Sequence, residues 1–142
     1  PLRVAAVYQV LQDTDEDQKE WSVGASYDFG MLTLAANYQD AKSLGNVEDN
    51  DADIWQVGVI VPVGAAGKVH LGYGEADVDV VDGKAKSYSI AYTHALSKRT
   101  TIYTGFNRTD NDNGLDYGVV EAPLGVTGDE SDVFAVGVNH KF

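Results

Sequence analysis

Carboxylates at alternate positions are the part of this sequence with the clearest potential for metal chemistry. Two sets have the spacing that opens an EF-hand calcium loop: Asp49, Asp51 and Asp53, and Asp110, Asp112 and Glu121. Ile54 stands where that loop requires a glycine, and in the second set Gly114 comes one position early. Because both matches break at the turn glycine, we expect solvated loop charge and no dedicated calcium site.

The other chemically active side chains form no recognisable catalytic pattern. His70, His94 and His140 share no metal-ligand spacing, and the chain has no cysteine. No nucleophile stands beside a base, as an outer-membrane lipid hydrolase or protease would require, and catalysis needs convergent polar groups in a pocket. We therefore expect no enzyme, no metal site and no cofactor.

Composition alone leaves the class of protein open. The 142 residues suit one domain, and the net charge of −12 argues against a nucleic-acid partner. Mean hydropathy is −0.22, and the longest apolar run, residues 57–67, contains Pro62 and is far shorter than the roughly 20 residues of a membrane-spanning helix. A transmembrane β-strand needs only about 9–11 residues with every second one apolar, so a barrel also fits these averages.

Alternation with a period of two residues recurs along the whole chain. It covers eight segments, at residues 2–11, 20–29, 32–39, 55–63, 68–74, 88–96, 102–106 and 134–142. No segment has a convincing helical period, and β-branched and aromatic residues dominate. The sequence therefore predicts an all-β, antiparallel fold of eight strands.

The connections between these segments alternate in length. Residues 28–31, 64–68 and 96–100 are predicted as tight turns, and residues 12–19, 40–52, 75–86 and 108–130 as long, acidic links. Bacterial outer-membrane barrels have this arrangement, with short periplasmic turns and longer outer loops. Pro62 fits least well, because proline cannot donate a hydrogen bond within a central strand.

One aromatic residue per segment lies near the end beside a long link. These residues are Tyr8, Trp21, Tyr38, Trp55, Tyr73, Tyr88, Phe106 and Phe134. A ring at one height on every strand is typical of an aromatic membrane girdle, whereas the core of a soluble sandwich needs its bulk at mid-strand. Tyr27, Phe29 and Phe142 would supply part of a second girdle. We therefore expect a transmembrane β-barrel.

Two stretches resemble a known family. Residues 136–142 look like the C-terminus of trimeric porins of the beta-proteobacterial and neisserial type, and residues 92–103, with Leu-Ser-Lys-Arg-Thr, are similar to a periplasmic turn of that family. The terminal phenylalanine with alternating residues before it resembles the signal read by the outer-membrane barrel assembly machinery: Phe134, Val136, Val138, His140 and Phe142. The resemblance implies a homotrimer in the outer membrane of a Gram-negative bacterium.

The family barrel has sixteen strands, so the resemblance makes residues 1–142 one segment, the C-terminal half of a porin. A complete eight-stranded barrel with a structural or adhesive role and no open channel is the alternative. Such a barrel must fill its interior with side chains, yet many inward positions are small, among them Gly24, Gly58, Gly72 and Gly137. We therefore expect the first and eighth strands not to pair with each other.

The predicted function is passive diffusion of small hydrophilic solutes and ions through a water-filled pore. The polar inward positions expected to line it are Arg3, Gln9, Glu20, Asp28, Asn37, Gln39, Gln56, Lys68, His70, Asn139 and Lys141. The basic ones, Arg3, Lys68 and Lys141, lie near the periplasmic rim, whereas the acidic loops should attract cations to the mouth. Expected partners are solutes, outer-membrane lipid and lipopolysaccharide, and the assembly machinery.

Overall fold

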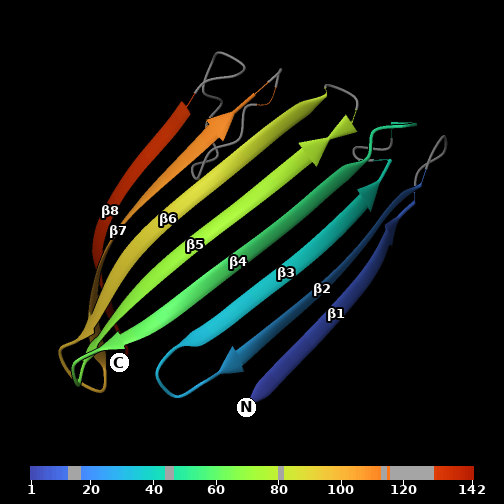
Figure 1. Cartoon of the computed structure of the whole chain (residues 1–142). Coiled ribbons are helices and arrows are strands. Elements are labelled where there is room, and N and C mark those ends of the chain that lie inside the picture. Colours follow the sequence, from blue (N-terminus) through green and yellow to red (C-terminus); the bar gives the residue numbers. More distant parts are fainter. Residues whose placement is uncertain (13–16, 44–46, 80–81, 113–114, 116–129) are drawn as a thin grey trace.

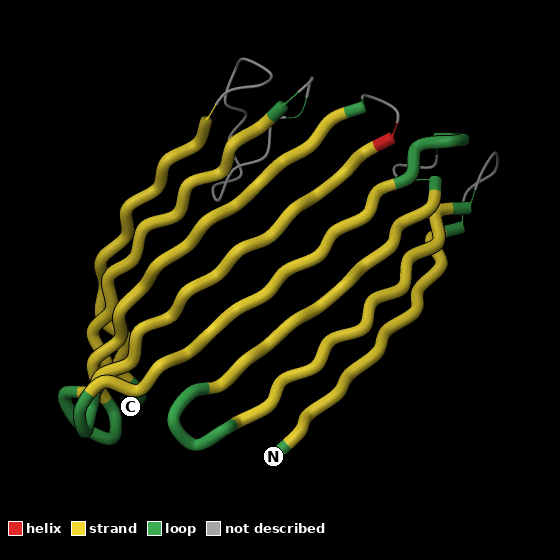
Figure 2. Tube along the Cα trace, viewed as in Figure 1, coloured by secondary structure: helices red, strands yellow, loops and turns green. Residues whose placement is uncertain are grey.

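The computed structural model describes residues 1–12, 17–43, 47–79, 82–112, 115 and 130–142. They form one antiparallel sheet of eight strands in which each strand pairs with its neighbours along the chain. The strands are β1 (Leu2–Leu11), β2 (Gln18–Asp28), β3 (Thr33–Lys42), β4 (Ala52–Val63), β5 (Gly67–Val78), β6 (Gly83–Ala95), β7 (Thr100–Asn111) and β8 (Glu130–His140). The curved sheet and its strand order are visible in Figure 1 and Figure 2.

The eight predicted strands are confirmed, and every predicted segment falls largely inside one of them. Strand lengths of 10 to 13 residues are sufficient to cross an outer membrane. The reason is the alternation itself, because a β-strand places successive side chains on opposite faces. No helix among the described residues has the length and apolar character needed to span a bilayer.

The three predicted short turns are also confirmed, and they all lie at the same end of the sheet as both ends of the chain (Figure 1). Gly30, with a φ of 85°, closes the β2–β3 turn, and its N–H donates to the Asp28 carboxylate at 2.7 Å. In the β6–β7 turn, Ser97 Oγ accepts hydrogen bonds from the N–H groups of Arg99 and Thr100, each at 3.1 Å. We call this end of the sheet the turn end, and the opposite end the loop end.

One predicted long link is wrong. Residues 75–86 were expected to form a loop, but β5 continues to Val78 and β6 begins at Gly83, so the link comprises only residues 79–82. Glu75 pairs with Lys86 and Asp77 with Lys84 across the two strands, and Lys84 Nζ lies 2.8 Å from the Asp77 carboxylate. Opposite charges on facing positions stabilise a hairpin, so the acidic residues extend the strands. The strict alternation of long and short connections therefore fails at this point.

Pro62 is accommodated near the end of β4. It pairs with Lys68 of β5, but the pairing of β4 with β3 already ends at Ile60. One side of β4 therefore has no neighbouring strand at Pro62. Proline is tolerated at such an edge, where a missing donor leaves the ladder intact.

The two outermost strands remain unpaired with each other. Within the described part of the chain, β1 pairs only with β2 and β8 pairs only with β7, and they lie at opposite edges of the sheet in Figure 1. The predicted lack of pairing between the first and last strands is confirmed. This sheet is therefore not a closed eight-stranded barrel.

Candidate membrane-facing and lumen-facing surfaces

The two faces of the sheet reverse the usual distribution of polar and apolar side chains. The face that carries Trp21, Ile90 and Val136, here called the outer face, exposes these side chains by 42, 52 and 75 %. The opposite, inner face carries Ser22, Ser87 and similar polar residues, which are half-buried. No large side chain among the described residues is fully buried. The hydrophobic effect would not stabilise this arrangement in water, so the outer face requires an apolar solvent.

All eight predicted girdle residues lie on the outer face, in cross-strand pairs. The pairs are Tyr8 with Trp21, Tyr38 with Trp55, Tyr73 with Tyr88, and Phe106 with Phe134. Neighbouring rings are in contact, with centroids 5.3 Å apart for Trp21 and Tyr38 and for Trp55 and Tyr73, and 5.0 Å apart for Tyr73 and Tyr88. The rings therefore form a row across the sheet.

This row runs diagonally to the strands. Trp21 pairs with Asp40, two residues from Tyr38; Trp55 pairs with Glu75, two residues from Tyr73. Tyr88 pairs with Arg108, again two residues from Phe106. The row thus moves by two residues toward the turn end for every two strands, which is one residue per strand.

That shift defines a strand tilt. A rise of about 3.3 Å per residue and a strand spacing of about 4.8 Å give an angle of roughly 35° between the row and the perpendicular to the strands. Strands of outer-membrane barrels tilt by about 35–45°. In a barrel with that tilt, the diagonal row becomes a level ring parallel to the membrane.

Phe29 and Phe142, just beyond the turn ends of β2 and β8, form part of a second aromatic row. Trp21 and Phe29 are eight residues apart, as are Phe134 and Phe142. Eight residues span roughly 26 Å along a strand, or about 22 Å along the membrane normal at a tilt of 35°. The apolar band of outer-membrane barrels is about 25 Å tall, so the two rows have the separation of two membrane boundaries.

A row of charges directly follows the upper aromatic row. On seven of the eight strands the next outer-face residue toward the loop end is charged: Lys19, Asp40, Asp53, Glu75, Lys86, Arg108 and Asp132. On β1 it is Val10. Arg108 binds Asp132 with two hydrogen bonds, of 2.8 and 2.7 Å, and the Tyr38 and Tyr73 hydroxyls donate to Asp53 and Glu75. On the outer face the apolar surface therefore ends at the aromatic row, and charged residues occupy the next position toward the loop end, as expected at a membrane–water boundary.

Two of the carboxylates with EF-hand spacing, Asp51 and Asp53, bind other side chains of the protein. Asp51 accepts hydrogen bonds from Lys42 Nζ at 2.9 Å and from the Ser43 N–H at 3.1 Å. The Lys42 ammonium and the Ser43 amide hold the pKa of Asp51 below its usual range. Within the part of the chain that the structure describes, no three histidine or acidic side chains are grouped to hold a metal ion. Glu121 lies outside the described residues.

The predicted pore-lining residues share the inner face. Strand parity and register place ten of them there, and Lys141 follows directly after β8: Arg3, Gln9, Glu20, Asp28, Asn37, Gln39, Gln56, Lys68, His70 and Asn139. Gln9 donates to Glu20 at 2.8 Å. The other predicted pore-lining residues are spread over the inner face and do not form one cluster.

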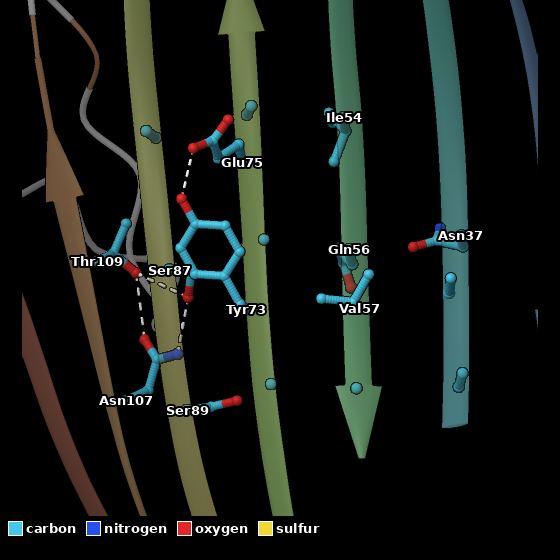
Figure 3. A pocket seen from close by; sticks show the side chains of 17 residues that line it. Asn37, Ile54, Gln56, Val57, Tyr73, Glu75, Ser87, Ser89, Asn107 and Thr109 are labelled. Atoms are coloured by element: carbon cyan, nitrogen blue, oxygen red, sulfur yellow. Dashed lines mark hydrogen bonds between the residues drawn. The ribbon is translucent and has the colours of Figure 1, made fainter. Parts of the chain in front are cut away.

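An open hollow of about 580 Å³ lies at the centre of the inner face. The polar side chains that line it from inner-face positions are uncharged and include Asn37, Gln56 and Ser89, and the outer-face residue Glu75 also borders it, as Figure 3 shows. Asn107 Nδ2 donates to Ser87 Oγ at 2.8 Å, and Gly58 and Gly72 face each other across β4 and β5. The small residues leave room for water next to amide and hydroxyl groups.

Charge is distributed unevenly over the inner face. On the inner-face positions of β3 to β8 there is no carboxylate, and the basic side chains there are Lys68 and His70. Toward the turn end Lys98 and Arg99 add to Arg3 and Lys141, with Asp28 as the single side-chain carboxylate among the described residues. The carboxylates of these strands instead lie on the outer face, in the charged row or between that row and the loop end. The sequence analysis did not identify this separation of carboxylates from the inner face, although it follows from the two-residue alternation of the strands.

Four of the residues that resemble an assembly signal lie together on the outer face of β8, and Phe142 follows just after its end. His140 Nδ1 is 2.9 Å from Thr100 Oγ1, and its ring packs against Phe142 at 4.9 Å between centroids. Phe134, Val136 and Val138 are exposed by 71, 75 and 63 %. They form an apolar stripe along an open edge of the sheet.

Comparisons with known proteins agree with this geometry. The family model for Gram-negative porins matches residues 1–114. Outer membrane porin protein 32 of Delftia acidovorans is 32 % identical over 131 residues, which are 89 % of this chain and 37 % of that protein. An outer membrane porin protein of Bordetella pertussis is 25 % identical over 178 residues, covering all of this chain and 43 % of that protein.

Solved structures show the same fold. An anion-selective porin from Comamonas acidovorans superposes with a TM-score of 0.86 at 28 % identity, over the whole chain and 46 % of that protein. A porin refined at 1.8 Å resolution matches with a TM-score of 0.67 at 19 % identity, over 99 % of this chain and 47 % of that one. The chain thus spans less than half the length of these relatives. It belongs to the Gram-negative porin family, and its cellular location is the outer membrane.

Proposed function

We propose that this chain forms the C-terminal half of a sixteen-stranded barrel that encloses a water-filled channel for small hydrophilic solutes and ions. Residues 1–142 act as one segment of that barrel. The observation that carries the proposal is the sheet itself, which has an apolar outer face bounded by aromatic rows and a polar inner face. Such a wall separates lipid from water.

The open edges support a larger barrel. In lipid, each unbonded backbone group costs several kcal/mol, so β1 and β8 require partner strands. They do not pair with each other, and the porin structures are about twice as long as this chain. A closed eight-stranded barrel without a channel, the alternative function, would also leave the hollow over Gly58 and Gly72 unfilled.

The inner wall supports a modest preference for anions. A relative is described as anion-selective, and the inner face of β3 to β8 carries Lys68 but no carboxylate. Selectivity in wide pores depends on the sign of the charges that line them. The acidic loop end opposes this preference at the mouth, where it concentrates cations.

The proposed partners follow from the outer face. The charged row lies where lipopolysaccharide headgroups meet the protein, and homotrimer formation would cover part of the apolar surface, as in the trimeric porins that the sequence resembles. We assign no catalytic role to the chain, because the polar inner residues that the structure describes form an open wall rather than a pocket of convergent groups.

Purified full-length porin that contains this segment should conduct ions in planar lipid bilayers. We expect stepwise conductance that rises in proportion to salt concentration, because ions would cross in bulk-like water. A folded protein that inserts into the bilayer but leaves it non-conducting would contradict the channel and favour a closed barrel.

Arginine substitutions at adjacent positions should separate the two faces. Ile90 lies on the outer face, 52 % exposed, and Ser89 lies on the inner face. Ile90→Arg should reduce the free energy of unfolding by about 1–3 kcal/mol, because a lipid-facing arginine costs about 2–4 kcal/mol at the bilayer midplane and less toward the boundary, and Ile90 lies between the two. Ser89→Arg, the matched control, should have a much smaller effect. Denaturant titration in lipid vesicles measures both, and equal effects would contradict the assignment of faces.

Phe142 tests the proposed assembly signal. One ring exposed by 105 % adds little to packing, so Phe142→Ala should leave refolding in detergent unchanged. In cells the same variant should yield less folded, heat-modifiable porin in the outer membrane, because the assembly machinery would recognise it poorly. Wild-type amounts of folded porin in the membrane would exclude this role.

A further inference from the structure

Two basic side chains and a hydroxyl group adjoin on the inner face near the turn end. Lys68 and His70 are two residues apart on β5, which places their Cα atoms roughly 7 Å apart on the same face. Lys68 pairs with Thr93 of β6, and His70 Nε2 lies 3.0 Å from Thr93 Oγ1. His70 and Thr93 are half-buried and Lys68 is exposed, so the group faces the lumen.

No carboxylate among the described residues lies close enough to neutralise this group. The facing inner positions are Ile60 and Pro62 on β4 and Ala91, Thr93 and Ala95 on β6. On β7 the nearest titratable residue is Tyr103, which leans over Gly137 of β8. Asp28 of β2 lies in the same row as His70 but three strands away, or about 14 Å. That distance exceeds the Debye length of about 8 Å at physiological salt.

Protonation of His70 would turn the group into a set of donors. In the imidazolium form both ring nitrogens donate, so Thr93 Oγ1 must accept from Nε2 and its own O–H is free to donate elsewhere. The Lys68 ammonium, the second ring N–H of His70 and the Thr93 hydroxyl then face no carboxylate among the neighbours just named, where the neutral Tyr103 hydroxyl is the one side-chain acceptor. Histidine changes its charge between about pH 5 and 8.

We propose that Lys68, His70 and Thr93 form a weak site for small anions on the inner wall, and that its strength increases when His70 is protonated. This inference rests on the proposed channel function. It assigns to β5 and β6 a pH-dependent step in ion selectivity near the periplasmic side of the pore.

Reversal potentials of the full-length porin in a potassium chloride gradient test the site. Between pH 8.0 and pH 6.0 the chloride-to-potassium permeability ratio should rise by about two-fold, because one added charge about 7 Å from a passing ion in water has an effect of this order. His70→Gln should remove most of that rise. Lys68→Gln should lower the ratio at both pH values but keep the rise. His94→Gln is the matched control, because His94 lies on the outer face.

The outcomes distinguish the site from the channel. A conducting porin with the same pH response in the wild type and in His70→Gln would overturn the role of His70. An unchanged ratio in Lys68→Gln would overturn the anion site itself, since that variant leaves the hydrogen bond between His70 and Thr93 in place. If no variant conducts, the proposed channel function fails first.

Discussion

In a bilayer, every backbone N–H and C=O group must be bonded within the protein, because lipid offers no hydrogen-bonding partner. A continuous antiparallel ladder meets this demand for all eight strands except at β1 and β8. The ladder then fixes the register, and the register fixes which side chains share a face. Lipid on one side and water on the other select apolar and polar residues at alternate positions.

Register also converts a diagonal pattern in the sheet into a level one in the membrane. The aromatic pairs move by one residue per strand, which matches strands tilted by roughly 35°. The charged residue that follows each ring on seven strands moves with it. The aromatic residues and the charged residues thus mark the same membrane boundary independently. The same parity keeps the carboxylates of β3 to β8 outside and leaves the inner wall weakly basic.

Sequence alone could predict the features that depend on alternation: eight strands, their faces, three short turns and the side on which Tyr8, Trp55 and Phe134 lie. It could not predict features that depend on which residues face each other across strands. The β5–β6 hairpin is longer than expected because Asp77 meets Lys84, and His70 meets Thr93 across 23 residues of sequence. Both contacts require the register, which periodicity alone leaves undetermined.

The depth of the upper aromatic row is the most direct test of this account. This chain has no cysteine, and in a full-length porin with any cysteine of the remaining half replaced, single cysteines at Tyr8, Trp55, Tyr88 and Phe134 can carry nitroxide labels. Collision rates with oxygen and with a water-soluble nickel chelate then report depth in the bilayer. We expect the four depths to agree within about 3 Å, one residue of rise. If the strands were instead perpendicular to the membrane plane, the offset of the row along the strands would place Tyr8 and Phe134 at depths roughly 20 Å apart. That result would contradict a row that is level with the membrane.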